Sequence, residues 1–318
     1  MSTNVNQISR RKFFSRAAVF GCSTLLAREN ARGDDAQRKI GLGFSLYGMK
    51  SLAPRAAINA VAEMGYDCIE LPVMTDWPAD SARMTSETRR ELREQLAERR
   101  LRLTSLMENL PALGDDAQHS ANLDRLKLAA ELARDLARDG KAPLIETIVG
   151  GKAGEFDAVK ERLVERLRDW ATIAESANAK LAIKAHISNA TQRPEQLLWL
   201  LDSVASRSLV AAYDYSHFQL QDLNMKETMN ALLPRAAFIH VKDTEHAQGK
   251  RGFLLPGEGT IDYVQMFKLL GQSSYQGDVV VEVSGQVFNK PGYDPLAAAR
   301  KCYNHLSDVF SKAGLKRG

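Results

Sequence analysis

The sequence predicts a single parallel (β/α)8 barrel, and three observations support this fold class. Short apolar segments of strand length alternate with amphipathic helical segments along most of the chain. Eight such strand segments occur, without internal repeats or low-complexity tracts. A chain of 318 residues leaves room for one barrel of about 250 residues after an N-terminal leader. The runner-up is an open doubly wound sheet, but no G-x-G-x-x-G follows the first strand, which disfavours a dinucleotide fold.

The predicted elements follow one another in regular order. The strands are expected at 39–49, 66–73, 101–110, 143–151, 180–188, 209–218, 237–243 and 278–284. Apolar spacing and Pro, Gly, Ser or Thr end signals predict helices at 54–64, 85–100, 121–137, 156–177, 194–204, 226–233, 263–270 and 295–311. The stretch 244–260 is predicted to be a long irregular loop, and a loop of that length in a barrel is usually functional.

The N-terminus predicts an export signal. Arg10 and Arg11 precede two phenylalanines and a short, weakly apolar run, which resembles the bacterial twin-arginine signal. That run is too short to span a bilayer about 30 Å thick. Residues 1–38 are therefore interpreted as a signal peptide and linker, and residues 39–318 as the barrel. The mature chain is expected in the periplasm without an integral membrane segment, and Cys22 leaves lipoprotein anchoring open.

Charge and cysteine content exclude some classes of function. The formal net charge is +4, but residues 1–33 contain six Lys or Arg and one acid, which leaves the remainder with 37 basic and 38 acidic residues, about −1. A near-neutral surface disfavours a nucleic-acid partner. Three cysteines do not form a disulfide framework, and Cys68 is expected to be a small core residue.

Ionisable side chains gather at the ends of the predicted strands. In a barrel of this kind, the C-terminal strand ends converge on one face and build the active site. So many buried charges are unlikely to be accidental, because each unpaired buried charge costs several kcal/mol. The residues concerned are Glu70, Glu108, Lys184, His186, Asp214, His217, His240, Lys242, Asp243 and Glu282.

Three of these residues form a candidate metal site. Asp214, His240 and Glu282 offer the mixed oxygen and nitrogen ligands that suit Mn, Co, Mg or Zn. The alternative is a hydrogen-bonded cluster of acids and histidine without metal. His217, three residues after Asp214, is expected to face the pocket and to bond a substrate hydroxyl or move a proton. Glu108 is a candidate ligand or base, or a structural cap.

With these residues in place, the chain resembles the sugar phosphate isomerase/epimerase superfamily, the xylose isomerase-like barrels. The resemblance covers about Ile40 to Leu306 and is strongest in YDYSHF, HVKD, LLPGEGTIDY and VEVS. It implies one divalent ion held by a Glu, an Asp, a His and a Glu from strands five to eight. Asp214, His240 and Glu282 would then be ligands, and His217 would contact the substrate.

One position departs from this pattern, because the strand-five Glu falls on Lys184. A protonated ammonium group cannot ligate a metal. Three solutions remain open. In the first, His186, on the same side of the strand, supplies the fourth ligand. In the second, Glu108 or Glu146 takes the place of the strand-five Glu. In the third, Lys184 itself provides positive charge or acts as a base.

The expected function is proton abstraction next to the carbonyl of a small-molecule sugar or keto-sugar, assisted by a divalent ion. Isomerisation, epimerisation and elimination from a keto-glycoside share that step, with Lys184, His186, His217 and Glu108 as candidate catalytic residues. A non-catalytic sugar-binding barrel is the main alternative. A metal-dependent endonuclease is disfavoured by the six histidines and the missing basic face. A homodimer is expected by analogy with related barrels.

Overall fold

The computed structural model describes residues 39–247 and 250–318, with the side chains of residues 246–250 left out. The predicted signal peptide, its linker and Cys22 lie outside the described residues. Within the described residues, no helix is both long and apolar enough to cross a membrane.

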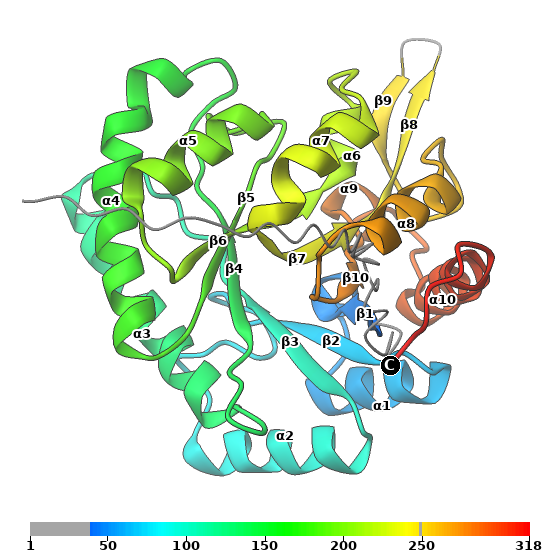
Figure 1. Cartoon of the computed structure of the whole chain (residues 1–318). Coiled ribbons are helices and arrows are strands. Elements are labelled where there is room, and N and C mark those ends of the chain that lie inside the picture. Colours follow the sequence, from blue (N-terminus) through cyan, green and yellow to red (C-terminus); the bar gives the residue numbers. More distant parts are fainter. Residues whose placement is uncertain (1–38, 248–249) are drawn as a thin grey trace, which may run out of the picture. The chain divides into compact units, whose positions relative to one another are not determined.

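The fold is the predicted closed barrel of parallel strands, with helices packed around its outside (Figure 1). The order around the barrel is β1-β10-β7-β6-β5-β4-β3-β2. The barrel strands are β1 (Leu42–Ser45), β2 (Cys68–Pro72), β3 (Arg102–Met107), β4 (Leu144–Ile148), β5 (Leu181–Lys184), β6 (Leu209–Asp214), β7 (Ala236–Val241) and β10 (Val279–Val281).

The described residues contain the eight predicted helices, to within a few residues at most ends, and two short helices that were not predicted, at 215–219 and 285–288. They are α1 (Pro54–Met64), α2 (Ser86–Glu98), α3 (Asp116–Asp135), α4 (Phe156–Ser176), α5 (Pro194–Val204), α6 (Tyr215–Gln219), α7 (Met225–Leu232), α8 (Tyr263–Gln272), α9 (Gly285–Phe288) and α10 (Pro295–Lys312), with short 3-10 turns η1 (Leu46–Met49) and η2 (Leu233–Arg235). Helix α3 begins earlier than predicted because the Asp115 side chain accepts a hydrogen bond from the Gln118 amide and caps it.

Three predictions about local structure were wrong. The strand expected at 209–218 ends at Asp214, whose side chain accepts a hydrogen bond from the Ser216 amide and caps helix α6. The first strand was expected to continue to Gly48, but it ends at Ser45, whose hydroxyl accepts from the Tyr47 amide and starts a 3-10 turn. The stretch 244–260 was expected to be irregular throughout. It contains an antiparallel hairpin of β8 (Asp243–Ala247) and β9 (Lys250–Leu254), whose charged residues and Gly252 obscure the strand alternation.

The remainder of that stretch is fixed by one buried carboxylate. Asp243 accepts hydrogen bonds from the amides of Thr244 (2.9 Å), Gly257 (3.0 Å) and Ile261 (3.0 Å). A Cβ atom at Gly259 would lie 2.3 Å from the Thr244 carbonyl oxygen, so this close approach requires glycine. Asp243 therefore anchors the loop beside the hairpin.

The interior of the barrel carries an apolar layer directly below a polar one. Cys68, Ala182, Ala212, Phe238 and Val280 form a separate buried cluster. Side chains two residues apart on a strand point to the same face. The next inward positions on the same strands or just beyond their ends are therefore Glu70, Lys184, Asp214, His240 and Glu282. The sequence prediction of Cys68 as a core residue is confirmed.

We expect this apolar layer to support the polar one. Phe238 is fully buried, and its ring centroid lies 4.6 Å from that of His240. Phe238→Ala should lower the free energy of unfolding by about 3–5 kcal/mol through loss of burial and creation of a cavity. Leu296→Ala is the control, because Leu296 is 41% exposed, and should change it by less than about 0.5 kcal/mol. Chemical denaturation checks both values, and equal effects would contradict the layered interior.

Candidate active site

Glu70 on β2 is the innermost carboxylate of the site. It is fully buried, and it accepts hydrogen bonds from Ser45 (2.6 Å) and Ser105 (2.8 Å) on the two neighbouring strands. His240 Nε2 lies 2.9 Å from its Oε2. Burial alone would raise the pKa of Glu70, but His240, Ser45 and Lys184 together lower it, so the carboxylate is ionised. Glu70 thereby fixes the orientation of the His240 ring.

Lys184, the last residue of β5, is the buried cation next to that ring. Its Nζ lies 2.8 Å from His240 Nδ1, 3.0 Å from Glu282 Oε2 and 3.2 Å from Glu146 Oε1. An ammonium group can only donate, so Nδ1 must be the acceptor and the His240 proton must sit on Nε2, toward Glu70. Burial would lower the pKa of Lys184, but Glu146 and Glu282 raise it above its ordinary value.

A second ammonium group lies beside the first. Lys242 Nζ is 2.5 Å from Asp214 Oδ2 and 2.5 Å from Glu282 Oε2, so it bridges the ends of two strands. The same Glu282 oxygen therefore accepts from both lysines. Burial would raise the pKa of Glu282, but the two lysines and His240 hold it well below its usual range. We call the connected residues the strand-end network: Glu70, Glu146, Lys184, Asp214, His240, Lys242 and Glu282.

Two histidines pack against this network. Asp214 Oδ1 accepts from the Ser216 amide and hydroxyl, and its Oδ2 lies 3.4 Å from His217 Nε2. His217 Nδ1 accepts from the Ile187 amide, and its side chain is fully buried. His217 Nε2 has no hydrogen-bond partner among the described residues. Sequence reasoning expected His217 to face the pocket, whereas the structure places it behind Asp214.

His186 is the more accessible of the two histidines. Its ring centroid lies 4.1 Å from that of His217, and the residue is only half-buried. The Ser188 amide donates to its Nδ1, which makes Nδ1 the acceptor and leaves the proton on Nε2. Burial, with help from Lys242 and Lys184, lowers the pKa of His186 to about 4. His186 is therefore a neutral hydrogen-bond donor at neutral pH.

Glu108 is engaged elsewhere. Its carboxylate lies 2.7 Å from Arg125 on α3, and Arg125 also reaches Asp80 (2.7 Å) and the Val73 carbonyl oxygen (2.6 Å). Burial raises the pKa of Glu108 to about 7, although Arg125 opposes the shift. The structure thus pairs Glu108 with Arg125. Its part in catalysis stays a prediction.

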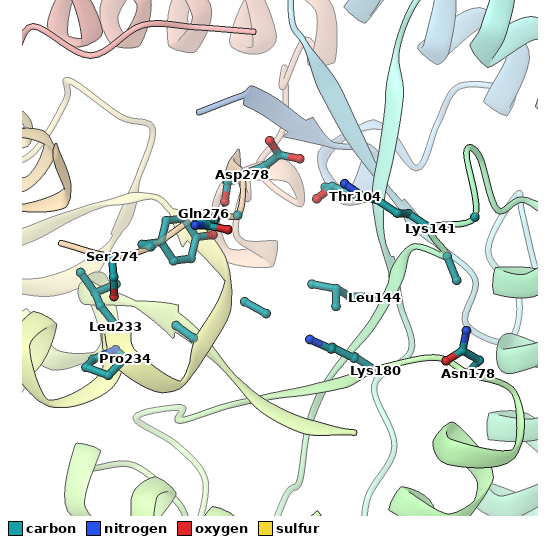
Figure 2. Close-up of a pocket in the computed structure, with 16 residues that line it drawn as sticks. Thr104, Lys141, Leu144, Asn178, Lys180, Leu233, Pro234, Ser274, Gln276 and Asp278 are labelled. Atoms are coloured by element: carbon teal, nitrogen blue, oxygen red, sulfur yellow. Dashed lines mark hydrogen bonds between the residues drawn. The ribbon is translucent and has the colours of Figure 1, made fainter. Parts of the chain in front are cut away.

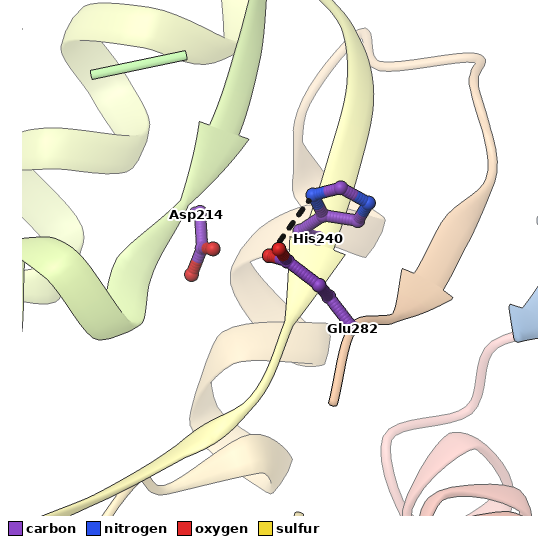
Figure 3. A group of neighbouring side chains, drawn as sticks. All are labelled: Asp214, His240 and Glu282. Atoms are coloured by element: carbon purple, nitrogen blue, oxygen red, sulfur yellow. Dashed lines mark ion pairs between the residues drawn. The ribbon is translucent and has the colours of Figure 1, made fainter. Parts of the chain in front are cut away.

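Asp214, His240 and Glu282 converge as the sequence predicted (Figure 3). One ligand atom from each lies within 4.8 Å of the others, which makes the three a candidate metal site. The donor types suit a divalent ion, but the donor atoms are already engaged. Lys184 donates to His240 Nδ1, both lysines donate to Glu282 Oε2, and Lys242 donates to Asp214 Oδ2. The arrangement as it stands does not fit a metal.

His186 does not supply the missing ligand either. The group of potential ligands found among the described residues contains Asp214, His240 and Glu282, but not His186. The Nδ1 atom of His186 is bound to Ser188. The three solutions proposed for the strand-five position stay predictions, and the structure shows Lys184 as a buried cation in contact with His240, Glu282 and Glu146.

The aromatic residues beside the network were not predicted. Tyr47 stacks on Trp77 with ring centroids 4.8 Å apart, and Phe288 meets Tyr47 edge-on at 5.0 Å. These residues are half-buried and follow β1, β2 and β10, at the same end of the barrel as the network. Burial and the Glu282 carboxylate raise the pKa of Tyr47. We call these three residues the aromatic rim.

A hollow of about 540 Å³ lies at the other end of the barrel. It is lined by residues just before or at the start of β4, β5, β7 and β10, among them Lys141, Lys180 and Asp278 (Figure 2). None of the strand-end network lines it. In barrels of this type, the chemistry takes place at the C-terminal ends of the strands, so we assign this hollow no catalytic role.

The lowered pKa of His186 gives a prediction about pH. The ring should stay neutral from pH 8 down to about pH 5 and gain its proton near pH 4, whereas an unfolded histidine titrates near 6.5. Because the unfolded chain binds this proton first, the contribution of His186 to stability is present above about pH 6.5 and is lost as the pH falls toward 4.

Histidine NMR titration of the protein beside a His186→Asn variant checks this prediction, since the variant assigns the resonance. A His186 signal with a midpoint near 6.5 would contradict the packing of His186 beside the two lysines.

Comparison with known proteins places this geometry in a family. Residues 58–306 match the family model described as xylose isomerase-like TIM barrel. The chain is 21% identical to inosose dehydratase of Salmonella typhimurium over 208 residues, covering 61% of this chain and 68% of that protein. It is 24% identical to L-ribulose 3-epimerase of Methylomonas sp. over 270 residues, covering 81% and 88%.

A solved structure shows the same fold. The crystal structure of the IOLI protein with a zinc atom superposes with a TM-score of 0.71 at 18% identity, covering 86% of this chain and 99% of that one. Because the family model matches most of the chain and the barrel closes as predicted, the chain belongs to the xylose isomerase-like TIM barrel family.

Proposed function

We propose that the protein is an enzyme that removes the proton next to a carbonyl group of a sugar or keto-sugar. The single observation that carries this proposal is the strand-end network, which places buried carboxylate, imidazole and ammonium groups in contact at the catalytic end of the barrel. The related proteins are an inosose dehydratase and an epimerase. Dehydration, epimerisation and isomerisation can all begin with the same proton transfer.

Glu282 is the best candidate for the proton acceptor. The side chains of Glu70, Glu146 and Asp214 are fully buried, whereas that of Glu282 is 11% exposed. Lys184 and Lys242 hold its Oε2, which leaves Oε1 as the oxygen that can accept a proton from a substrate. The electron pair of the broken C–H bond would move to the carbonyl oxygen and form an enediolate, which requires nearby positive charge or hydrogen-bond donors.

The surroundings of Glu282 suit a small polyhydroxylated substrate. The aromatic rim offers flat apolar surface next to the network, and such rings can pack against the C–H face of a sugar. His186 offers an Nε2 proton for a hydroxyl or carbonyl oxygen.

We also propose that the twin-arginine-like N-terminus directs the chain to the periplasm. Glycosides and keto-glycosides are more available there than phosphorylated sugars.

Hydrogen exchange tests the proposed reaction without knowledge of the product. The protein is incubated in D2O with a panel of ketoses, inososes and 3-keto-glycosides, and NMR follows deuterium incorporation beside the carbonyl. We expect exchange or conversion of at least one compound. Glu282→Gln should slow it by at least about 100-fold, because the amide cannot accept the proton.

Glu94→Gln is the matched control, since Glu94 lies on the outer helix α2 and its side chain is 62% exposed. It should retain the wild-type rate. Binding of a sugar by the wild-type protein without exchange on any compound would contradict the enzyme and favour a sugar-binding barrel. Exchange that survives in Glu282→Gln would overturn the role assigned to that residue.

A further inference from the structure

The position expected to hold a metal ion is surrounded by two lysines. One potential ligand atom of each residue, Asp214 Oδ2, His240 Nδ1 and Glu282 Oε2, accepts a hydrogen bond from an ammonium group, at distances of 2.5 to 3.0 Å. The three candidate ligands are fully or almost fully buried, so water cannot take the place of these donors at low cost. The negative charge of the Asp214 and Glu282 carboxylates can be balanced either by a divalent ion or by the two lysines.

The lone pair of His240 Nδ1 favours the lysines over a metal ion. His240 Nε2 carries its proton toward Glu70, so Nδ1 is the only ring atom that could bind a metal, and Lys184 already donates to it. Metal coordination needs that same lone pair. An ion could bind there only if Lys184 moved away or lost its proton.

The positive charge beside Glu282 also favours the lysines over a metal ion. Both ammonium nitrogens contact Glu282 Oε2, at 3.0 and 2.5 Å. An ion bound to that oxygen would therefore lie close to two positive charges in a buried environment, where like charges repel strongly. Glu146 and Asp214 supply further negative charge to the lysines themselves. The ammonium groups thus balance Asp214 and Glu282 without an ion, whereas neither carboxylate oxygen of Glu146 has a hydrogen-bond partner among the described residues.

We propose that the ammonium groups of Lys184 and Lys242 replace the divalent ion in this chain, and that Lys242 supplies the positive charge that meets the substrate oxygen. The second part rests on the proposed function. Lys184 donates to His240 and Glu282, and its Nζ forms an ion pair with Glu146 at 3.2 Å. It acts as a positioning residue that fills the ion's place.

Lys242 has one donor to spare. Among the described residues, it donates to two carboxylates, Asp214 and Glu282, and an ammonium group has three donors. The ring of Phe253, from strand β9 of the hairpin, lies 5.1 Å from its Nζ and shields the charge from water. The remaining N–H suits an anionic oxygen, such as that of an enediolate formed beside Glu282.

Metal content tests the first part independently of any reaction. The purified protein and an Asp214→Asn variant, which keeps the size of the side chain, are incubated with excess Mn²⁺ or Zn²⁺, desalted and analysed by mass spectrometry. We expect no metal that depends on Asp214. An ion that both samples and a third sample, His240→Ala, retain equally lies outside the site and supports the proposal; its loss from His240→Ala would overturn it. About one ion per chain in the wild type that is lost in the variant would overturn it.

Lys184→Glu extends this test, because it removes the cation and adds an oxygen ligand. A folded Lys184→Glu protein should gain about one ion per chain that the wild type lacks. If it folds, as judged by circular dichroism, and gains none, Lys184 is not what excludes the ion and the proposal fails. If it does not fold, the comparison of wild type with Asp214→Asn decides.

The reaction tests the second part. Deuterium exchange by the wild type should be unchanged after treatment with a chelator and should fall by at least about 100-fold in Lys242→Met, which keeps the length of the side chain but not the charge. Exchange that requires added metal would overturn the proposal. If the wild type exchanges no compound at all, the proposed function fails, but the metal measurements still decide whether the lysines replace the ion.

Discussion

The structure depends on one constraint, which is that every charge in the mouth of the barrel must find a partner. Burying an unpaired carboxylate or ammonium group costs several kcal/mol, and removing one partner of a buried pair costs about 3–5 kcal/mol. The chain meets this constraint with a connected network in which Glu282 accepts from Lys184 and Lys242, and His240 joins Lys184 to Glu70. Glu146 is held only by its ion pair with Lys184, because neither of its oxygens has a hydrogen-bond partner among the described residues. Few side chains of the network can change without affecting the others.

The alternation of the strands explains how the network comes together. Each inward position of the apolar layer is followed two residues later by a charged or imidazole group. Because side chains two residues apart on a strand point to the same face, the polar layer lies directly above the apolar one. This regularity also explains why the fold and the convergence of Asp214, His240 and Glu282 could be predicted from the sequence. Strand ends in a closed parallel barrel meet whatever their spacing along the chain.

What could not be predicted depends on side-chain direction and on contacts between distant strands. The sequence analysis placed Lys242 among the ionisable groups at the strand ends, but nothing in the sequence showed that it would bridge Asp214 and Glu282. Glu108 follows a strand like the others, yet it faces Arg125 on a helix. The aromatic rim was missed because Tyr47, Trp77 and Phe288 lie in short turns without a pattern of their own.

The most direct test of the central claim is a crystal structure of the protein grown in excess Mn²⁺, with anomalous data collected for manganese. The account predicts no anomalous peak among Asp214, His240 and Glu282, and electron density that places the Lys184 and Lys242 side chains against the carboxylates. A peak within ligand distance of His240 Nδ1, with Lys184 turned away, would contradict it and would make this chain a metal-dependent barrel.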